Sequence, residues 1–245
     1  MRRVAAIALA FAGASLPTFA TDPPSVFLEQ LTWTEVRDAV AAGKTTILVP
    51  IGGTEQNGPH MALGKHNARA TELARRIAQG LGDALVAPTM AYVPEGAIEP
   101  PAAHMKYPGT ISIPEDAFEK TLEGAARSFR RAGFRTIVFL GDHGGYLRSL
   151  KRVAARLDAQ WAPAVHVLVP SAYYEEVPHA GRADTSLTLG TGLAGMVRTD
   201  RANPNATGLG AAQDPSGADQ KAGLAMAQQI VDRTVASLKK ATAHR

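Results

Sequence analysis

Short apolar segments rich in β-branched residues recur along the chain and set the strongest limit on its fold. They cover residues 45–51, 84–91, 136–140 and 164–169. Each segment is continuously apolar rather than alternating, which is typical of strands that are buried on both faces. The sequence therefore predicts four strands of a parallel sheet.

Amphipathic segments separate and follow these strands and predict helices at residues 68–81, 114–132, 145–160 and 218–240. The second of them begins at Pro114 and stops before Gly133, which suits the two ends of a helix. Alternating strands and helices predict a three-layer α-β-α sandwich with a mostly parallel central sheet. With 245 residues, 45% of them hydrophobic, we expect one α/β domain over residues 21–245, with a surface loop at residues 200–217.

The first twenty residues have the pattern of a secretory leader. Arg2 and Arg3 precede an apolar run, and small residues follow up to Ala20. The apolar run at residues 4–14 is too short to span a bilayer. We therefore expect residues 1–20 to be a signal peptide, with cleavage near Ala20, a periplasmic or secreted protein, and no membrane anchor afterwards.

Charge and cysteine content exclude two classes of function. Loss of Arg2 and Arg3 lowers the formal net charge from +4 to +2, which gives no indication of a nucleic-acid partner. The chain has no cysteine, so thiolate chemistry is excluded and any metal must have nitrogen and oxygen ligands.

Polar segments follow the predicted strands at the points where the strands end. Residues 55–67 follow the first strand and residues 141–146 (GDHGGY) follow the third, while residues 99–112 and 179–186 are also polar and irregular. In open α/β sheets the ligand crevice lies beyond the carboxyl ends of the strands. We therefore expect all four segments to border one crevice.

Four side chains of these segments are candidates for metal binding or catalysis: Glu55, His66, His143 and His179. Taken singly, each histidine has the ordinary interpretation of a solvated or capping loop residue. Their convergence on one edge of the sheet indicates a site instead. Two histidines and one carboxylate are a common ligand set for catalytic zinc, because they leave a position open for water. We expect His60 and His104 to line the same cavity.

Four sequence blocks resemble those of the creatininase (creatinine amidohydrolase) family and occur in the same order. They are LVPIGGTEQNGPH at residues 48–60, HMKYPGTIS at 104–112, GDHGGY at 141–146 and HAGRADTS at 179–186. The resemblance implies a three-layer α/β fold and a homo-oligomer, a hexamer in the family. It also implies divalent metal ions, typically Zn or Mn, and hydrolysis of C–N bonds in small amides, often cyclic ones.

The same resemblance makes Glu55 and His143 metal ligands and gives His179 a role in proton transfer. The chain departs from the family pattern at Asn57, which stands where the family has a metal-binding histidine, and at His66, which stands where the family has a metal-bridging aspartate. An imidazole offers one lone pair to one metal, whereas a carboxylate can bridge two. His66 therefore argues against a bridged pair of ions.

We accordingly expect one divalent ion bound by Glu55, His66 and His143. Asp142 stands where the family has an asparagine, and Asp184 where it has a glutamate. Either aspartate would complete the ligand set or orient a ligand histidine through its second ring nitrogen. Glu55 is alternatively the catalytic base, and Asp184 is a further candidate catalytic carboxylate.

The expected reaction is the hydrolysis of a small amide, lactam or ester by metal-activated water. His179 would protonate the leaving nitrogen, and the backbone amides of Gly144 and Gly145 would stabilise the oxyanion. Arg182 either pairs with a substrate carboxylate or is an ordinary surface charge. The alternative function is that of an exported protein that binds metal or ligand without turnover.

Overall fold

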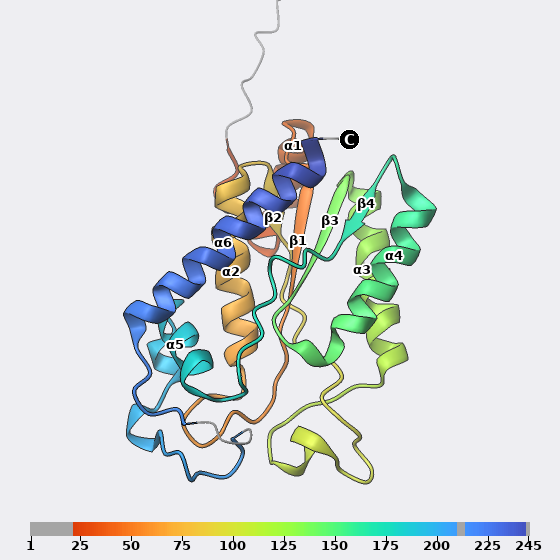
Figure 1. The fold of residues 1–245 in the computed structure, drawn as a ribbon. Coiled ribbons are helices and arrows are strands. Elements are labelled where there is room, and N and C mark those ends of the chain that lie inside the picture. The colour runs from red at the N-terminus through yellow and green to blue at the C-terminus, as the bar shows by residue number, and fades with distance from the viewer. Residues whose placement is uncertain (1–21, 210–213, 244–245) are drawn as a thin grey trace, which may run out of the picture.

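One parallel sheet forms the centre of the computed structural model, which describes residues 22–209 and 214–243 (Figure 1). The expected leader at residues 1–20 lies outside the described residues. The strands are ordered β2-β1-β3-β4 and all neighbours are parallel. Their bounds are Thr46–Ile51 for β1, Ala84–Val86 for β2, Thr136–Gly141 for β3 and His166–Leu168 for β4. β1 and β3 are buried at every residue, as their continuous apolar sequences predict.

The second strand is shorter than its apolar sequence predicts. Residues 84–91 were expected to pair throughout, but β2 ends at Val86. Pro88 follows and has no N–H to donate to a ladder. The chain meets β1 again only through an isolated bridge between Ile51 and Met90. Residues 87–114 therefore leave the sheet and extend past its edge, toward the carboxyl ends of the strands.

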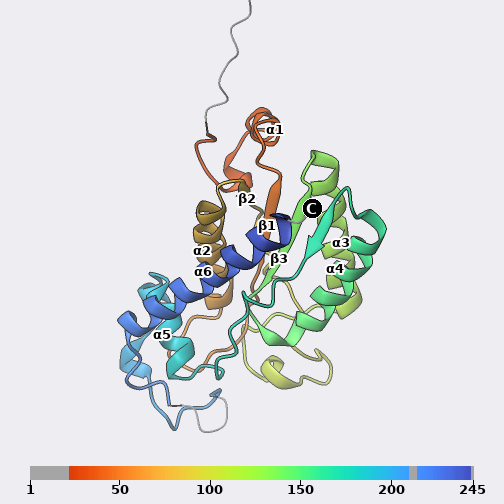
Figure 2. The ribbon, with the colours of Figure 1, turned by 45° about the horizontal axis from the view of Figure 1, so that its top comes forward.

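The helices cover both faces of the sheet, in the three layers that the sequence predicts (Figures 1 and 2). Their bounds are Trp33–Ala41 for α1, Lys65–Leu81 for α2, Glu115–Ala132 for α3, Leu147–Trp161 for α4, Arg182–Gly190 for α5 and Gln220–Ala243 for α6. Alternate β1 residues enter opposite layers: Ile47 and Val49 pack with α3 and α4, whereas Leu48 packs with α2 and α6. Within the described ranges, no helix has the length and apolar character needed to cross a membrane.

Two helices were not predicted. α1 begins with a capping box, in which the Glu35 amide donates to Thr32 Oγ1 at 3.3 Å and the Thr32 amide donates to Glu35 Oε2 at 2.7 Å. α5 occupies residues that we expected to be irregular, because Asp184, Thr185 and Ser186 are polar. These three residues are buried, so a helix with little apolar periodicity lies inside the molecule.

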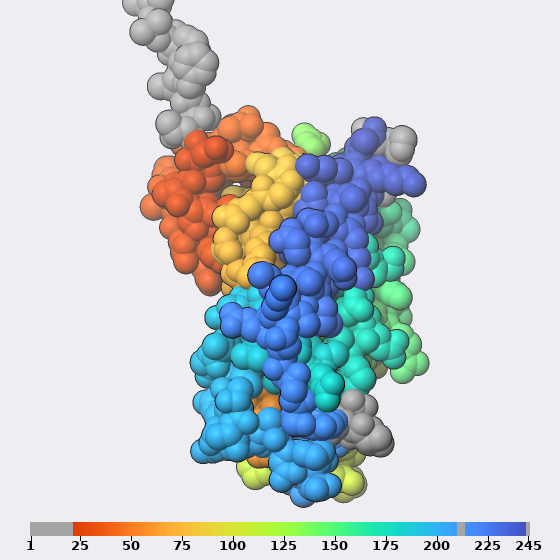
Figure 3. All heavy atoms as spheres, turned by 60° about the vertical axis from the view of Figure 1, so that its left-hand side comes forward, coloured from red at the N-terminus to blue at the C-terminus, as the bar shows by residue number. Residues whose placement is uncertain are grey.

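Two glycines let α5 approach α6 closely. A Cβ added at Gly223 would overlap the carbonyl oxygen of Ser186, and one added at Gly190 would overlap the backbone of Gly223. The Asp219 amide also donates to Ser186 Oγ at 2.9 Å, just before α6 begins. Figure 3 shows α6 running along the outside of this layer beside α2. The crossing therefore fixes the position of α5, which carries Asp184 toward the site.

Replacing Gly223 by alanine should destabilise the protein by about 2 kcal/mol or more, because the methyl group forces two backbones apart. The matched control is Gly124→Ala in α3, where nothing lies within 4 Å of the added Cβ and the residue is exposed. This control should gain about 0.5–1 kcal/mol from helix propensity. Urea unfolding measures both free energies. Equal stability of the two variants would contradict the close crossing.

Candidate metal centre

The candidate site lies at the carboxyl ends of the strands, where the long connecting segments gather at the bottom of Figure 1. Four segments contribute to it: the β1–α2 segment, the β2–α3 segment with its short helix η2 at Ala103–Lys106, the β3–α4 segment, and the β4–α5 segment. The predicted convergence of these loops is therefore observed.

The carboxylate of Glu55 is the centre of the site. Its side chain is 0% exposed, and four histidines direct a ring nitrogen toward it. The nitrogen–oxygen distances are 2.9 Å for His66 Nε2, 3.3 Å for His104 Nε2, 3.6 Å for His179 Nδ1 and 3.9 Å for His143 Nε2. A carboxylate buried this deeply needs such partners, because removal from water penalises its charged form.

The pKa values of the site reflect the balance between burial and charge. Burial by itself would raise the pKa of Glu55, but the hydrogen bond from His66 and the charges around it outweigh burial and hold the pKa well below its usual range. Burial lowers the pKa of His143 and of His179 to about 4. Both imidazoles are therefore neutral at neutral pH, the form that binds metals or accepts protons.

His66 lies between two carboxylates. Nε2 is 2.9 Å from Glu55 Oε1, and Nδ1 is 2.7 Å from Asp142 Oδ2. The structure thus brings Glu55, His66 and His143 together, as predicted, but both ring nitrogens of His66 are engaged by carboxylates. In this arrangement His66 and Asp142 hold Glu55 in place, and their direct binding of an ion stays a prediction.

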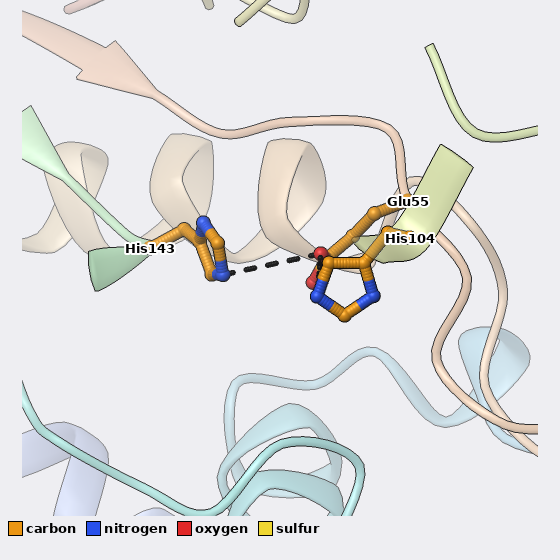
Figure 4. A group of neighbouring side chains, drawn as sticks. All are labelled: Glu55, His104 and His143. Carbon is orange, nitrogen blue, oxygen red and sulfur yellow. Dashed lines mark ion pairs between the residues drawn. The ribbon is translucent and has the colours of Figure 1, made fainter. Parts of the chain in front are cut away.

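Glu55, His104 and His143 form a group with the spacing of metal ligands. One ligand atom from each lies within 4.8 Å of the other two. Figure 4 shows the two imidazoles beside the carboxylate, with His104 coming from η2 and His143 from the segment after β3. Glu55 Oε2 has no hydrogen-bond partner among the described residues. Two imidazoles and a buried, unpartnered carboxylate oxygen fit a divalent ion such as zinc.

A network of buried charges supports Glu55 from the side of α2. Lys65 and Arg69 are 1% and 2% exposed, and both pair with Asp184, which is 2% exposed. Arg69 also pairs with Asp142 at 2.9 Å. Burial raises the pKa of Asp184, but Lys65 and Arg69 outweigh this and hold it well below its usual value. Asp184 was predicted to be a catalytic or ligand carboxylate, and the structure places it in these ion pairs.

The sequence contains a signal for this network that we did not use. The inward face of α2 contains Ala70, Leu73, Ala74, Ile77 and Ala78. Continuing the same helical spacing toward the N-terminus places Lys65, His66 and Arg69 on that face. Charged residues at inward positions of a helix indicate a buried network.

Two further residues of the site were not predicted. Glu95 is 4% exposed and reaches the site from the β2–α3 segment, with Oε2 3.7 Å from His143 Nδ1. Burial and then the negative charge of Glu55 raise the pKa of Glu95 to about 9. The amide nitrogen of Gln56 lies 3.0 Å from His104 Nδ1 and 3.1 Å from His179 Nε2, and so links these two rings. Glu95 lies nine residues after β2, in a long loop. Its position next to His143 depends on the path of this loop, which the local sequence does not determine.

The remaining predicted residues lie at the edge of the site or outside it. His60 is fully buried, with Nε2 3.0 Å from Thr185 Oγ1. Gly144 and Gly145 begin the turn before α4, and the Gly145 amide points to His143 Nδ1 at 3.4 Å. Arg182 is exposed, and its Nε donates to the carbonyl of Ser216 at 2.9 Å. Its side chain thus binds a loop, as a surface residue does.

A pocket of about 120 Å³ adjoins these groups. Its lining includes His66, His143, Gly144, Tyr174 and His179. The pocket would therefore bring a small molecule next to three of the four histidines that surround Glu55.

The fold and the site together define an α/β protein with a candidate divalent-metal centre at the carboxyl ends of its strands. The family model described as "Creatininase: Creatinine amidohydrolase" matches residues 29–238. The chain therefore belongs to the creatininase family.

Curated relatives and a solved structure resemble this chain. It is 37% identical over 153 residues to the "Mycofactocin precursor peptide peptidase" of Mycolicibacterium smegmatis, covering 58% of this chain and 56% of the relative. It is 32% identical over 119 residues to the "Creatinine amidohydrolase" of Pseudomonas putida, covering 49% and 45%. The chain thus spans less than two thirds of the length of these relatives. A crystal structure of creatinine amidohydrolase superposes with a TM-score of 0.72 at 22% identity, covering 89% of this chain and 98% of that one, which shows the fold.

Replacing Asp184 by asparagine should destabilise the protein by about 3–5 kcal/mol, because two buried cations lose their shared partner. The control is Asp116→Asn, whose pair with Lys120 is exposed and should contribute less than about 0.5 kcal/mol. Chemical denaturation measures both. Wild-type stability together with lost turnover would instead support the predicted catalytic role of Asp184.

Glu95 should make the metal-free protein less stable as the pH rises. Its pKa is about 9 in the folded protein against an ordinary value of 4.5, so the folded state retains a proton that the unfolded state loses between these values. Relative to Glu95→Gln, the wild type should lose up to about 1.4 kcal/mol of unfolding free energy per pH unit between pH 7 and 9. Parallel pH profiles of the two proteins in chelator would contradict this.

Proposed function

We propose that this protein is a metal-dependent hydrolase of the C–N bond of a small amide. The resemblance to the family favours a cyclic amide as the substrate. The observation that carries the proposal is the group of Glu55, His104 and His143, with its unpartnered carboxylate oxygen at the strand ends. Membership of the creatininase family supports it. So do the names of the relatives, one an amidohydrolase and one a peptide peptidase, which point to amide-type bonds.

One divalent ion, zinc or manganese, is the proposed cofactor. The solved structures that share the fold include a mutant creatininase of Zn-Zn type and a Mn form of creatininase. Glu55, His104 and His143 would hold the ion here. When bound, it would supply Lewis acidity that activates water and polarises a carbonyl. His66 fixes the Glu55 carboxylate through its 2.9 Å hydrogen bond, so the ligand oxygen keeps one position.

His179 is the proposed proton carrier. Burial keeps it neutral at neutral pH, so it can accept a proton from the attacking water and deliver it to the leaving nitrogen. Gln56 holds its ring at 3.1 Å, which fixes the direction of its nitrogens. The amide of Gly144 lies at the start of a helical turn beside the pocket and would stabilise negative charge on the carbonyl oxygen. The Gly145 amide, which we expected to share this role, points to His143 Nδ1 at 3.4 Å instead.

The cellular location and the oligomeric state of the protein are also part of the proposal. The leader pattern of residues 1–20 supports a periplasmic or secreted protein, and the family resemblance supports a homo-oligomer. The substrate would then be a small amide, lactam or ester met outside the cytoplasm.

Metal content and turnover of two variants test this function. His104→Ala and His143→Ala should each lose the bound ion and at least about 100-fold in kcat/KM, roughly 2.7 kcal/mol, on a panel of cyclic amides, lactams and short peptides. His166→Ala is the control, because His166 lies on β4 and pairs with Asp158 at 3.0 Å instead. Metal analysis of the purified proteins accompanies the kinetics.

Two outcomes would contradict the proposed hydrolase. Wild-type protein that retains its metal but hydrolyses nothing on the panel would support the alternative, an exported metal- or ligand-binding protein. Full activity in metal-free protein would exclude metal dependence.

A further inference from the structure

Gln56 is a buried residue whose side-chain amide lies between two histidines of the site. It is 8% exposed, and its amide nitrogen lies 3.0 Å from His104 Nδ1 and 3.1 Å from His179 Nε2. The two rings are neighbours, with centroids 4.5 Å apart. The backbone of Gln56 is held as well, since its N–H donates to Thr110 Oγ1 at 3.1 Å. One side chain therefore contacts a proposed metal ligand and the proposed proton carrier at the same time.

The backbone amide of Gly58 fixes which end of the Gln56 side chain faces the histidines. It lies 3.0 Å from Gln56 Oε1, and a backbone N–H can only donate, so the atom that it meets is the oxygen. The same oxygen takes the space beside Gly208, where an added Cβ would overlap it. The nitrogen of the side-chain amide is thereby left facing His104 and His179.

The orientation of this amide determines where each ring carries its proton. An NH2 group only donates, so His104 Nδ1 and His179 Nε2 are both acceptors. In a neutral imidazole with one accepting nitrogen, the proton is on the other nitrogen. In the neutral rings the proton is therefore on Nε2 of His104, 3.3 Å from Glu55 Oε2, and on Nδ1 of His179, 3.6 Å from Glu55 Oε1. Both N–H groups face the buried carboxylate.

This pattern suits the metal-free site but not a bound ion. An imidazole binds a metal through a lone pair, so His104 Nε2 becomes available only when the ring proton is on Nδ1. That Nδ1–H would then face the NH2 group of Gln56, donor against donor. Metal-binding histidines almost always donate their other ring N–H to an acceptor. Gln56 Oε1 becomes this acceptor if the side-chain amide makes a half turn about its last torsion.

We propose that the Gln56 amide turns over when a divalent ion binds through His104, and that the same turn prepares His179 as a base. After the turn, Gln56 Oε1 accepts from His104 Nδ1–H and from His179 Nε2–H. Nδ1 of His179 then presents a lone pair toward Glu55. Each ring stays neutral, because water removes a proton from one nitrogen and delivers one to the other.

Gln56 is in this way a positioning residue that couples the metal centre to the proton carrier. The inference rests on the metal dependence of the proposed function and deepens it, since His179 accepts a proton at Nδ1 only after the turn. The turn gives up the hydrogen bond from the Gly58 amide, so it weakens metal binding by the free energy of that bond.

Ring-nitrogen NMR of the full chain, labelled with ¹⁵N-histidine, tests the coupling directly, because the two tautomers of a neutral imidazole give different ¹⁵N shifts. The His179 signals are identified by their absence in His179→Ala. They should show Nδ1–H in chelator and Nε2–H once zinc is bound. His166 is the internal control: its Nδ1 pairs with Asp158 at 3.0 Å, away from the site, and its tautomer should not change.

Two substitutions of Gln56 separate this role from packing alone. Gln56→Glu has only acceptors, so it keeps the bond from Gly58 and favours the turned pattern before any ion binds. In mildly alkaline buffer it should show Nε2–H at His179 even in chelator, and bind zinc at least about 10-fold more tightly, because no hydrogen bond is given up. Gln56→Met has a similar length and no hydrogen-bonding group, so in this variant the His179 tautomer should no longer follow zinc.

The matched control for the added charge is Gln160→Glu, on the exposed side of α4, which should leave zinc affinity unchanged. The spectra distinguish the turn from simple attraction between the new carboxylate and the ion, because attraction alone leaves His179 as Nδ1–H in chelator. The wild-type spectra decide the question even if neither Gln56 variant folds.

Several results would overturn the coupling. A His179 tautomer that is the same in chelator and with zinc would show that the amide does not turn. Equal or weaker zinc binding by Gln56→Glu would show that the amide does not oppose the ion. A wild type that binds no zinc would overturn this inference and the metal-dependent function together, whereas a wild type that shows the tautomer change but no turnover would overturn the function alone.

Discussion

Burial of the Glu55 carboxylate is the constraint on which the rest of the site depends. A fully buried carboxylate is stable only where donors or cations replace the water it has lost. Four imidazoles from four segments of the chain provide these partners, at 2.9–3.9 Å. Each of these segments leaves or approaches the carboxyl edge of the sheet, so the parallel topology is what lets them meet. The parallel arrangement of the strands thus determines which side chains surround Glu55.

The second requirement is a scaffold that keeps the surrounding charges in place. α2 carries Lys65, His66 and Arg69 on the same inward face that, one turn later, packs apolar residues against the sheet. α5 presents Asp184 to both cations, and its position follows from the glycine crossing with α6. The packing of the helices and the geometry of the site therefore depend on each other. A shift of α5 would leave Lys65 and Arg69 without their shared carboxylate.

Much of this arrangement could be predicted from the sequence, and the parts that could not have physical reasons. Continuous apolar runs identified the sheet because strands buried on both faces leave that pattern, and the crevice rule then placed Glu55 and His143 together. α5 was missed because its buried face is made of Asp184, Thr185 and Ser186, which have no apolar period. Glu95 and the position of His104 beside Glu55 depend on the path of a 28-residue segment, residues 87–114. Local patterns do not determine such a path.

The two oxygens of Glu55 have different surroundings, and this difference favours the proposed single ion over a bridged pair. On one side, His66 occupies the place of the family's bridging aspartate and donates to Glu55 Oε1, with Lys65 and Arg69 behind it. Asn57, at the place of a family ligand, uses its amide to hold the Glu55 carbonyl at 2.9 Å. His66 therefore already engages Glu55 Oε1, so this oxygen is not free for a second ion. On the other side, Glu55 Oε2 has no hydrogen-bond partner among the described residues and faces His104 and His143. The chain thus engages one oxygen of Glu55 with His66 and leaves the other, Oε2, unpartnered beside two imidazoles, which is the arrangement proposed above to hold a single ion.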